Sequence, residues 1–304
     1  MYEIKTGNRR KCDSDRRLDG QIVVITGANT GIGKVTALEL SKRGAKIIIG
    51  CRDVEKATKA VNDIKTDNPD ADIVVHKLDL SSLKSVRMFA DEVKQCVDRL
   101  DILVNNAGVM MCPEWKTMDG FELQFGTNHL GHFLLTMHLL PLIKQASTAR
   151  IITVSSSGHM MGKIHLDNIN LRNGAYTSWK AYAQSKLANV LFTRELARRL
   201  GGLNSNVKTY CVHPGPVNTD LQRHRDGGPA GRLLLKCIGL TPEMGAQTSL
   251  YCALDADLDK QTGCYYANCR KVNNMISTAT DDRMAELLWD MSCNLVNLED
   301  NLKI

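Results

Sequence analysis

The chain has 304 residues, of which 43% are hydrophobic and 24% charged, and its formal net charge is +6. This composition is typical of a globular protein; it excludes a disordered or fibrous one, and the modest charge gives no indication of nucleic acid as a partner. The ten cysteines form no C-x-x-C pair and follow no signal peptide, which favours reduced thiols and predicts no metal site.

Residues 1–19 are polar and basic, and we expect them to form a flexible tail before a single folded domain that spans 20–304. No apolar run reaches the roughly 20 residues that a membrane span requires. The run that comes nearest, 130–143, contains His132, His138 and Pro141, so we expect a buried helix there.

An apolar run at 22–26 leads into three glycines, Gly27, Gly31 and Gly33, and a helical pattern follows at 34–43. The spacing G-x-x-x-G-x-G matches neither the P-loop pattern nor the dinucleotide pattern G-x-G-x-x-G. Glycines nevertheless let a backbone approach a pyrophosphate closely, and the N-terminus of the following helix attracts the anion. The context therefore favours nucleotide binding over a βα turn that merely needs glycine.

Strand-like and helix-like patterns alternate along the rest of the chain. Strands are predicted at 22–26, 46–50, 73–77, 102–104, 151–154 and 207–212, and helices from Asp53, from Leu83, near 121–143 and at 179–200. This alternation predicts an α/β fold: a single doubly wound Rossmann-type domain whose parallel sheet of about seven strands is covered by helices on both faces. Such sheets bind ligands beyond the carboxyl ends of their strands, so we expect the polar residues that follow strands to gather there: Asp79, Asn105, Ser155 to Ser157 and His213.

Two segments fit the pattern Y-x-x-x-K, namely Tyr176 with Lys180 and Tyr182 with Lys186. Tyr182 lies near the start of a convincing amphipathic helix, whereas Gly174 argues against a helix around Tyr176. A lysine about 4 Å away supplies around 4 kcal/mol at an effective dielectric near 20, which is about what lowers a tyrosine pKa from about 10 to about 7. The pair is therefore suited to general acid/base catalysis, although an exposed helix pair with no catalytic role fits the spacing equally well.

Two further signals accompany this pair. A predicted strand ends in three serines, one of which can donate a hydrogen bond to a substrate oxygen; ordinary turn chemistry is the alternative. Asn128 interrupts an apolar helix, which is unfavourable unless its amide finds partners, and local capping or a kink is the alternative. His129 and His132 nearby are more typical of satisfied helix residues than of ligands.

Together these motifs resemble the classical short-chain dehydrogenase/reductase family, from residue 20 to about residue 296. They occur in the family's order: "TGANTGIG" at 26–33, "DL" at 79–80, "NNAG" at 105–108, Asn128, a serine after the fifth strand, "YAQSK" at 182–186 and "PGPVNT" at 214–219. Longer stretches such as "NHLGHFLLT" and "SKLANVLFTRELARRL" are similar to the retinol dehydrogenase branch, which reduces retinal and lipid-derived aldehydes with NADPH.

The resemblance implies an oxidoreductase that transfers a hydride between NADP(H) and an apolar alcohol or aldehyde, above all a retinoid or a lipid-derived aldehyde. A reductase of steroid or xenobiotic carbonyls is an alternative. A catalytically silent scaffold that senses nucleotides is another, but such a scaffold should have lost part of the serine, tyrosine and lysine set, and none is missing here.

The resemblance also implies roles for four catalytic residues. Tyr182 would give its proton to the carbonyl oxygen during reduction, while Lys186 would lower the tyrosine pKa and hold the nicotinamide ribose. Ser156, rather than Ser155, would fix the carbonyl oxygen. Asn128 would position a water molecule that links Lys186 to solvent.

The cofactor site is carried over in the same way. Its residues would be Gly27, Asn29, Thr30, Gly31, Ile32, Gly33, Arg52, Asp79, Leu80, Asn106, Ala107, Gly108, Tyr182, Lys186, Pro214, Gly215, Val217 and Thr219. NADP(H) is favoured over NAD(H) because the acid of NAD-using relatives is replaced by Cys51 and is followed by Arg52. A charged hydrogen bond from this arginine would favour the phosphorylated cofactor roughly tenfold to a hundredfold. NAD(H) stays an alternative because of the acidic residue Asp53, but this residue is equally well explained as the N-cap of the next helix.

The family resemblance bears on location as well. Members of this branch usually begin with a hydrophobic membrane anchor, and none is found in this sequence. We therefore expect a cytoplasmic protein. Peripheral contact with the endoplasmic reticulum membrane and assembly into a homo-oligomer are alternatives that the sequence does not decide. The segment near 220–241 is expected to cover the substrate, its apolar part at 231–240 acting as a lid or touching lipid.

Overall fold

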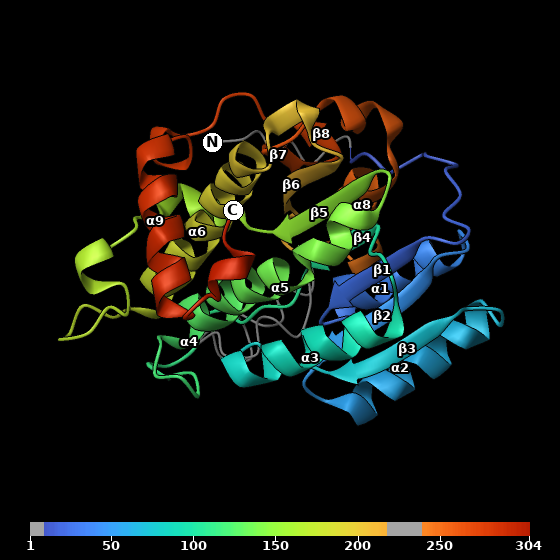
Figure 1. Ribbon diagram of the computed structural model, residues 1–304, viewed down its shortest axis with the longest axis horizontal. Coiled ribbons are helices and arrows are strands. Elements are labelled where there is room, and N and C mark those ends of the chain that lie inside the picture. Colours follow the sequence, from blue (N-terminus) through green and yellow to red (C-terminus); the bar gives the residue numbers. More distant parts are fainter. Residues whose placement is uncertain (1–8, 218–238) are drawn as a thin grey trace.

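A computed structural model describes residues 9–217 and 239–304, and within them eight strands form one sheet in the order β3-β2-β1-β4-β5-β6-β7-β8 (Figure 1). The strands are β1 (Ile22–Thr26), β2 (Lys46–Cys51), β3 (Ile73–Lys77), β4 (Ile102–Asn105), β5 (Ala149–Val154), β6 (Val207–His213), β7 (Cys264–Ala267) and β8 (Arg270–Lys271). The first seven pair in parallel, as predicted, and β8 runs antiparallel to β7. The two-residue β8 adds one strand to the predicted seven.

Helices cover both faces of this sheet (Figure 1). They are α1 (Gly31–Ser41), α2 (Val54–Asp67), α3 (Leu83–Cys96), α4 (Leu123–Phe125), α5 (Gly131–Gln145), α6 (Ser178–Arg199), α8 (Pro242–Leu254) and α9 (Asp282–Leu295). A hydrophobic core lies on each face of the sheet, and the side chains of β1 contribute to both. Val24 packs with α3, α5, α6 and α9, whereas Val23 and Ile25 point to the opposite face and pack with α1, α2 and α8. Strands buried on both faces explain the nearly continuous runs of valine and isoleucine.

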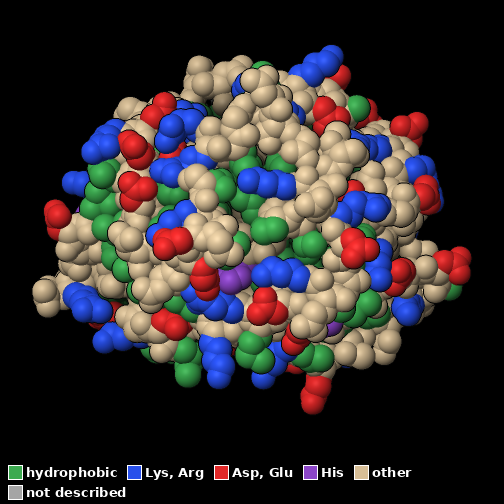
Figure 2. All heavy atoms as spheres, in the orientation of Figure 1, with side chains coloured by type: hydrophobic (Ala, Val, Ile, Leu, Met, Phe, Trp, Pro, Cys, Tyr) green, Lys and Arg blue, Asp and Glu red, His purple; other side chains and the backbone are tan. Residues whose placement is uncertain are grey.

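Charged side chains of both signs are interspersed over the molecular surface. Figure 2 shows lysine and arginine next to aspartate and glutamate across the visible face, with hydrophobic side chains gathered near its centre. In the parts of the chain that the structure describes, no helix combines the length and the apolarity needed to cross a bilayer.

The predicted helix near 121–143 is built from three joined pieces. α4 leads into a π-helical turn at Gly126–Leu130, and this turn leads directly into α5. The N–H of Gly131 donates to the carbonyl oxygen of Gly126, five residues earlier, which is the signature of a π-turn. Asn128 lies in the middle of the turn, at the position where the sequence indicated a disturbed helix.

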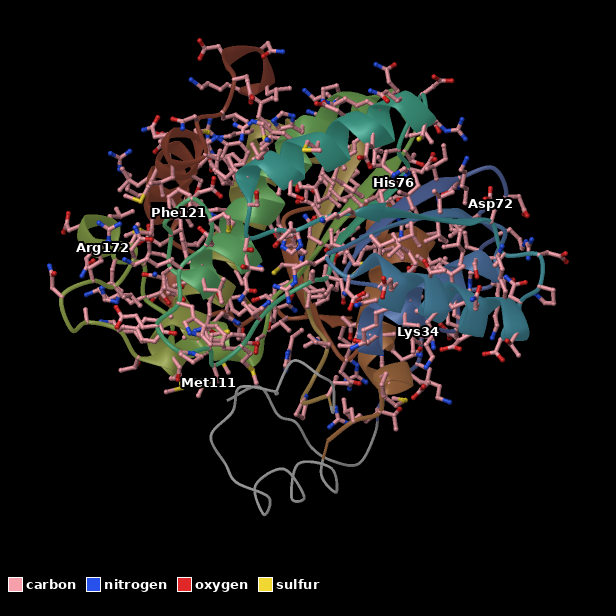
Figure 3. All side chains as sticks on the ribbon, turned by 90° about the horizontal axis from the view of Figure 1, so that it is seen from below. Lys34, Asp72, His76, Met111, Phe121 and Arg172 are labelled. Atoms are coloured by element: carbon pink, nitrogen blue, oxygen red, sulfur yellow. The ribbon has the colours of Figure 1, made fainter. Side chains whose placement is uncertain are left out.

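Parallel strands place the loops that follow them at one edge of the sheet. Figure 3 marks the two edges: Asp72 precedes β3 on one side, and Met111 follows β4 on the other. The polar residues expected to gather at the carboxyl edge do so, since Asn105 and His213 end β4 and β6 and Ser155 directly follows β5.

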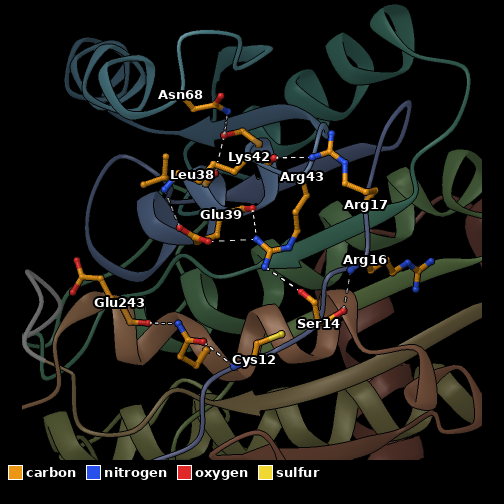
Figure 4. A network of polar contacts seen from close by, with 12 residues as sticks. Cys12, Ser14, Arg16, Arg17, Leu38, Glu39, Lys42, Arg43, Asn68 and Glu243 are labelled. Carbon is orange, nitrogen blue, oxygen red and sulfur yellow. Dashed lines mark hydrogen bonds and ion pairs between the residues drawn. The ribbon is translucent and has the colours of Figure 1, made fainter.

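Residues 9–18 form an extended arm that lies against the domain (Figure 4). The backbone N–H of Cys12 donates to Oε1 of Gln247 on α8 at 2.9 Å, and the arginine side chain of Arg43 donates to the carbonyl oxygen of Ser14 at 3.3 Å. Leu18 is fully buried in the core beneath α1. The expectation of a flexible tail is therefore wrong for residues 9–19, because this polar arm is held by backbone and side-chain hydrogen bonds that its composition does not reveal.

The predicted substrate-covering segment, 220–241, falls almost entirely outside the described residues. At its end, Leu240 forms an isolated parallel bridge with Val217, and its N–H donates to the carbonyl oxygen of Pro216 at 2.7 Å.

Candidate active site

The glycine turn between β1 and α1 leaves space where side chains would otherwise stand. A Cβ atom on Gly27 would lie 2.8 Å from Cβ of Ala107, and one on Gly33 would lie 2.6 Å from the carbonyl oxygen of Gly27. Gly27 and Gly31 also have positive φ angles, of 68° and 55°. The N-cap residue of α1, Thr30, makes no side-chain capping bond, so the helix N-terminus is available to an anion. This cradle fits the pyrophosphate of a dinucleotide.

Lys34 follows these glycines but is directed elsewhere. It lies on α1 (Figure 3), and its Nζ pairs with Oδ2 of Asp63 on α2 at 2.6 Å. This exposed ion pair agrees with assigning Lys34 no role at the phosphates.

The hydroxyl of Thr26, at the end of β1, joins the glycine turn to the "NNAG" loop. Its Oγ1 accepts hydrogen bonds from the backbone N–H groups of Asn106 and Ala107, both at 2.9 Å. It also contacts Nε2 of His132 on α5 at 2.9 Å. Since the hydroxyl accepts twice, its single proton goes to Nε2, and His132 carries its own proton on Nδ1.

His132 completes this network from the opposite side. Its Nδ1 donates to the backbone carbonyl oxygen of Asn128 at 3.1 Å, and complete burial lowers its pKa to about 4. The neutral ring is what the network needs, because it must donate on one side and accept on the other. Neither Thr26 nor His132 was singled out as functional from the sequence; a threonine inside "TGANTGIG" and a histidine four residues after Asn128 were the available signals.

Asn128 is fully buried, and its side-chain amide is committed to protein partners. Its Oδ1 accepts from the N–H of Val109 at 2.8 Å, and its Nδ2 donates to the carbonyl oxygen of Val109 and to Oγ of Ser185. The amide therefore fixes the loop after β4 onto α6. The role that the resemblance implied for Asn128, positioning a water molecule that links Lys186 to solvent, stays a prediction.

The serines after β5 differ in their surroundings. Ser155 is buried, and its Oγ donates to the backbone carbonyl oxygen of Lys186 at 2.7 Å. Ser156 is partly exposed and lies against the phenol of Tyr182, where its hydroxyl lowers the tyrosine pKa. A Cβ atom on Gly158 would stand 3.2 Å from Cε1 of Tyr182 and 3.5 Å from Oγ of Ser156, so this glycine leaves room beside the pair.

Lys186 lies one helical turn after Tyr182 on α6. Its Nζ donates to the carbonyl oxygen of Val154 at 3.1 Å and stands 5.7 Å from the centre of the Tyr182 ring. Burial lowers the pKa of Lys186 to about 8.

The pKa of Tyr182 differs from the lowered value that the sequence predicted. Burial raises the pKa of Tyr182 above its usual value, and the hydrogen bond from Ser156 lowers it by less. The expectation that the pKa of Tyr182 lies below its usual value is therefore wrong, although a charged Lys186 ammonium still favours the phenolate. The physical reason is that the phenol is almost completely buried, while the lysine donates to Val154 and is itself easily discharged.

The second Y-x-x-x-K segment is not a helical pair. Tyr176 precedes α6, and its hydroxyl donates to the carbonyl oxygen of Cys112 at 2.6 Å. Lys180 donates through Nζ to the carbonyl oxygen of Ala175 at 3.3 Å. The two side chains thus bond to different backbone carbonyl oxygens and form no pair, in agreement with the choice of Tyr182 over Tyr176.

The loop after β2 presents one basic and one acidic residue. Arg52 is exposed directly after the buried Cys51. Oδ1 of Asp53 accepts a hydrogen bond from the N–H of Lys56 at 2.9 Å, so this carboxylate caps α2 as predicted. After β3, Oδ1 of Asp79 accepts hydrogen bonds from the backbone N–H and the hydroxyl of Ser81, and Leu80 beside it is buried.

The loop after β6 contacts the glycine turn. Gly215 has a positive φ angle of 88°, which favours glycine after Pro214. A Cβ atom on Gly245 of α8 would lie 2.6 Å from Val217 and 3.0 Å from Ile32, so α8 brings these two residues together. The described cofactor candidates, Asn29, Thr30 and Gly108 included, therefore lie in the loops along one edge of the sheet, while Thr219 falls outside the described residues.

A Rossmann sheet, a glycine cradle at a helix N-terminus and an adjacent serine, tyrosine and lysine are typical of oxidoreductases that act on CH–OH groups with a nicotinamide cofactor. Residues 21–228 match the family model of short chain dehydrogenases, and the chain belongs to this family, in the branch that contains the retinol dehydrogenases.

Similar proteins span nearly the whole chain. Retinol dehydrogenase 11 from Homo sapiens is 47% identical over 287 residues, which cover 94% of this chain and 89% of the relative. Retinol dehydrogenase 13 from Homo sapiens is 45% identical over 298 residues, which cover 95% and 88%. The crystal structure of an uncharacterised protein from Mycobacterium paratuberculosis has a TM-score of 0.78 and 38% identity, and the match covers 96% of this chain and 99% of that one.

Proposed function

We propose that this protein transfers a hydride between NADP(H) and an apolar aldehyde or alcohol, with a retinoid or a lipid-derived aldehyde as substrate. The names of its relatives, retinol dehydrogenases, support the substrate class. The observation that carries the proposal is the placement of Ser156 against the buried phenol of Tyr182, with Lys186 one turn further along α6.

Tyr182 is the general acid in reduction: it stays protonated at neutral pH because burial raises its pKa, and it gives its proton to the substrate oxygen. The hydroxyl of Ser156 holds that oxygen, and the lack of a side chain on Gly158 keeps the Ser156–Tyr182 pair uncrowded. Lys186 is charged below about pH 8 and stabilises the phenolate that forms. Bound NADPH supplies the hydride. Asn128 acts as a positioning residue, since its amide holds the loop after β4 on α6.

The cofactor would be held by residues of the carboxyl edge. The cradle of Gly27, Gly31 and Gly33 would take the pyrophosphate, and Lys186 would hold the nicotinamide ribose. Arg52 supports NADP(H) over NAD(H), because it is exposed in the loop after β2 and the neighbouring Asp53 carboxylate is occupied in capping α2. A cytoplasmic location and peripheral contact with the endoplasmic reticulum membrane stay predictions.

The test is NADPH oxidation by the purified protein with all-trans-retinal, medium-chain aldehydes and a ketosteroid as alternative acceptors. Tyr182→Phe should lower kcat by about a hundredfold to ten-thousandfold, the usual contribution of a positioned general acid. Tyr176→Phe is the matched control and should keep activity, because this hydroxyl serves the loop after β4. Full activity of Tyr182→Phe would refute the catalytic assignment. If only the ketosteroid were reduced, the substrate class would be steroid carbonyls. If no acceptor were reduced, the result would favour a catalytically silent scaffold.

A further inference from the structure

A pocket of about 590 Å³ lies beyond the carboxyl ends of β6 and β7, between α8 and the 3-10 helix η2 (Ser157–Met161). Ser157, which follows Ser156, lines it on one side, and Pro214 and Gly215 line it on another. A Cβ atom on Gly158, the residue after Ser157, would stand 3.2 Å from Cε1 of Tyr182, so this wall of the pocket adjoins the Ser156–Tyr182 pair.

Four cationic side chains line this basic pocket: Arg9, Arg10, Arg270 and Lys271. Among the described lining residues none is acidic, and none of the four cations forms an ion pair within the described ranges. Other arginines of the same arm are paired; the side chain of Arg17, for example, lies 2.6 Å from Asp19. Four unpaired charges of one sign around a pocket create a field that attracts an anion.

Two structural elements deliver these charges. Arg9 and Arg10 end the N-terminal arm, where the N–H of Arg10 donates to Oδ1 of Asn268 at 3.0 Å. Arg270 and Lys271 form β8, which the two-residue turn at Asn268 and Cys269 folds back on β7, both residues having positive φ angles. The arm and the hairpin are thus bound to each other at the turn. The basic side chains are held at the pocket by backbone contacts.

Part of the pocket lining is apolar. Met160, Leu240, Met244 and Val272 contribute to it, and the side chain of Arg9 reaches within 3.4 Å of where a Cβ on Gly215 would stand. Methionine and leucine side chains suit an alkyl or polyene chain, and they offer no hydrogen bonds to a sugar or a peptide. The pocket lining therefore combines apolar side chains with cationic ones, beside amides such as those of Asn273 and Asn274.

We propose that this pocket binds the anionic end of an amphiphilic substrate, a carboxylate or phosphate monoester at the far end of an apolar chain whose aldehyde reaches Tyr182. The proposal rests on the proposed function for its reaction, and among the lipid-derived aldehydes it favours those that carry a negative charge. The neutral aldehyde of equal length is then the poorer substrate.

Binding is measured first, without turnover, by calorimetry with dodecanoate and with dodecanol. The wild type should bind dodecanoate more tightly, and the double variant Arg270→Glu/Lys271→Glu should lose about tenfold in its affinity for dodecanoate but little for dodecanol. The control is Lys59→Glu/Lys65→Glu, which changes the net charge equally on α2, at the opposite end of the sheet. Equal loss in both double variants, or no preference in the wild type, would overturn the proposal.

Turnover is measured second, with dodecanal and with the same aldehyde carrying a terminal carboxylate. The ratio of the two kcat/KM values should favour the carboxylate in the wild type and fall about tenfold in Arg270→Glu/Lys271→Glu. The preference should also shrink as the ionic strength rises from about 0.02 to about 0.3 M, since salt screens exposed charges. If neither aldehyde is reduced, the proposed function fails, and calorimetry still decides whether the pocket binds anions.

Vesicles of phosphatidylcholine with phosphatidylserine provide the last comparison. Anionic lipid presents a similar charge, so sedimentation with vesicles is measured for the wild type and the Arg270→Glu/Lys271→Glu variant. Unchanged dodecanoate affinity together with lost vesicle binding would mean that the cations serve a membrane surface, and the substrate proposal would be rejected. Lost dodecanoate affinity with unchanged vesicle binding supports the substrate pocket.

Discussion

The hydroxyl of Thr26 and the imidazole of His132 lie 2.9 Å apart although 106 positions separate them in the chain. This contact joins the end of β1 to α5 across the sheet's carboxyl edge. The same hydroxyl accepts the N–H groups of Asn106 and Ala107. One oxygen atom therefore holds the loop that the cofactor is expected to touch and the helix that carries Asn128.

Replacing Thr26 by valine keeps the shape of the side chain and removes the hydroxyl. Two buried backbone N–H groups and Nε2 of His132 then lose a partner, so the free energy of unfolding should fall by about 2–4 kcal/mol. The Kd for NADPH should rise, since the "NNAG" loop loses its anchor. Urea unfolding and fluorescence titration measure the two effects. Thr26→Ser keeps the hydroxyl and should restore both; a serine variant as impaired as the valine variant would contradict the network.

Stability should fall in mild acid, in part because of two completely buried histidines. Complete burial lowers the pKa of His129 to about 3 and that of His132 to about 4, whereas both titrate near 6.5 in the unfolded chain. Below about pH 6.5 each histidine is protonated in the unfolded state but stays neutral in the folded state. The free energy of unfolding therefore falls by about 1.4 kcal/mol per pH unit for each histidine. Urea unfolding between about pH 6.5 and about pH 4.5 measures this slope.

The variant His129→Phe removes one of the two titrating groups and so measures its contribution. His129 lies among aromatic rings, with its centroid 5.1 Å from that of Phe125 and 6.1 Å from that of Phe133, and phenylalanine suits this site. The slope of stability against pH should decrease by about 1.4 kcal/mol per pH unit. Ser292 loses its contact with the ring but keeps its hydrogen bond to Leu288. A slope equal to that of the wild type would show that His129 titrates normally.

Cofactor selectivity should depend on Arg52. Arg52→Gln removes the charge expected at the 2′-phosphate, so the preference for NADPH over NADH should fall roughly tenfold to a hundredfold. The measurement is the ratio of kcat/KM for the two cofactors with one aldehyde. Lys59→Gln removes a charge from the exposed face of α2 and should leave the ratio unchanged. Equal changes in both variants would mean that overall charge, and no specific contact, sets the preference.

The rate of reduction should fall in alkaline solution. Lys186 has a pKa lowered to about 8, so it is charged below that pH and loses its charge above it. Since the ammonium stabilises the phenolate of Tyr182, kcat/KM for reduction should decline above about pH 8. Lys186→Arg keeps a charge and should shift the decline to higher pH, whereas Lys180→Arg should not. A wild-type profile that is flat to about pH 10 would refute this role.

Much of the fold was predictable because its strands are buried on both faces. The apolar runs at Ile22–Thr26 and 46–50 lie in β1 and β2, whose residues are nearly all buried. The N-cap of α2 at Asp53 was likewise predictable, since one side chain and a backbone group three residues later form it. Such features depend on neighbours in the sequence.

The features that escaped prediction depend on distant partners. The N-terminal arm is polar, and its place is set by Gln247 and Asn268, more than two hundred positions away. The amide of Asn128 finds Val109 and Ser185 only in the folded chain. The pKa of Tyr182 depends on how completely the phenol is buried, which spacing on a helix does not state.

The π-helical turn at Gly126–Leu130 fixes the number of residues that can join α4 to α5. Because the turn holds one residue more than an α-helical turn, deleting a single residue would restore regular α-helix and rotate everything before it by about 100° relative to α5. Asn128 would then leave the side that faces Ser185, and its carbonyl would leave His132. Homologous chains should therefore vary here by substitution, while insertions and deletions are excluded between Gly126 and Leu130.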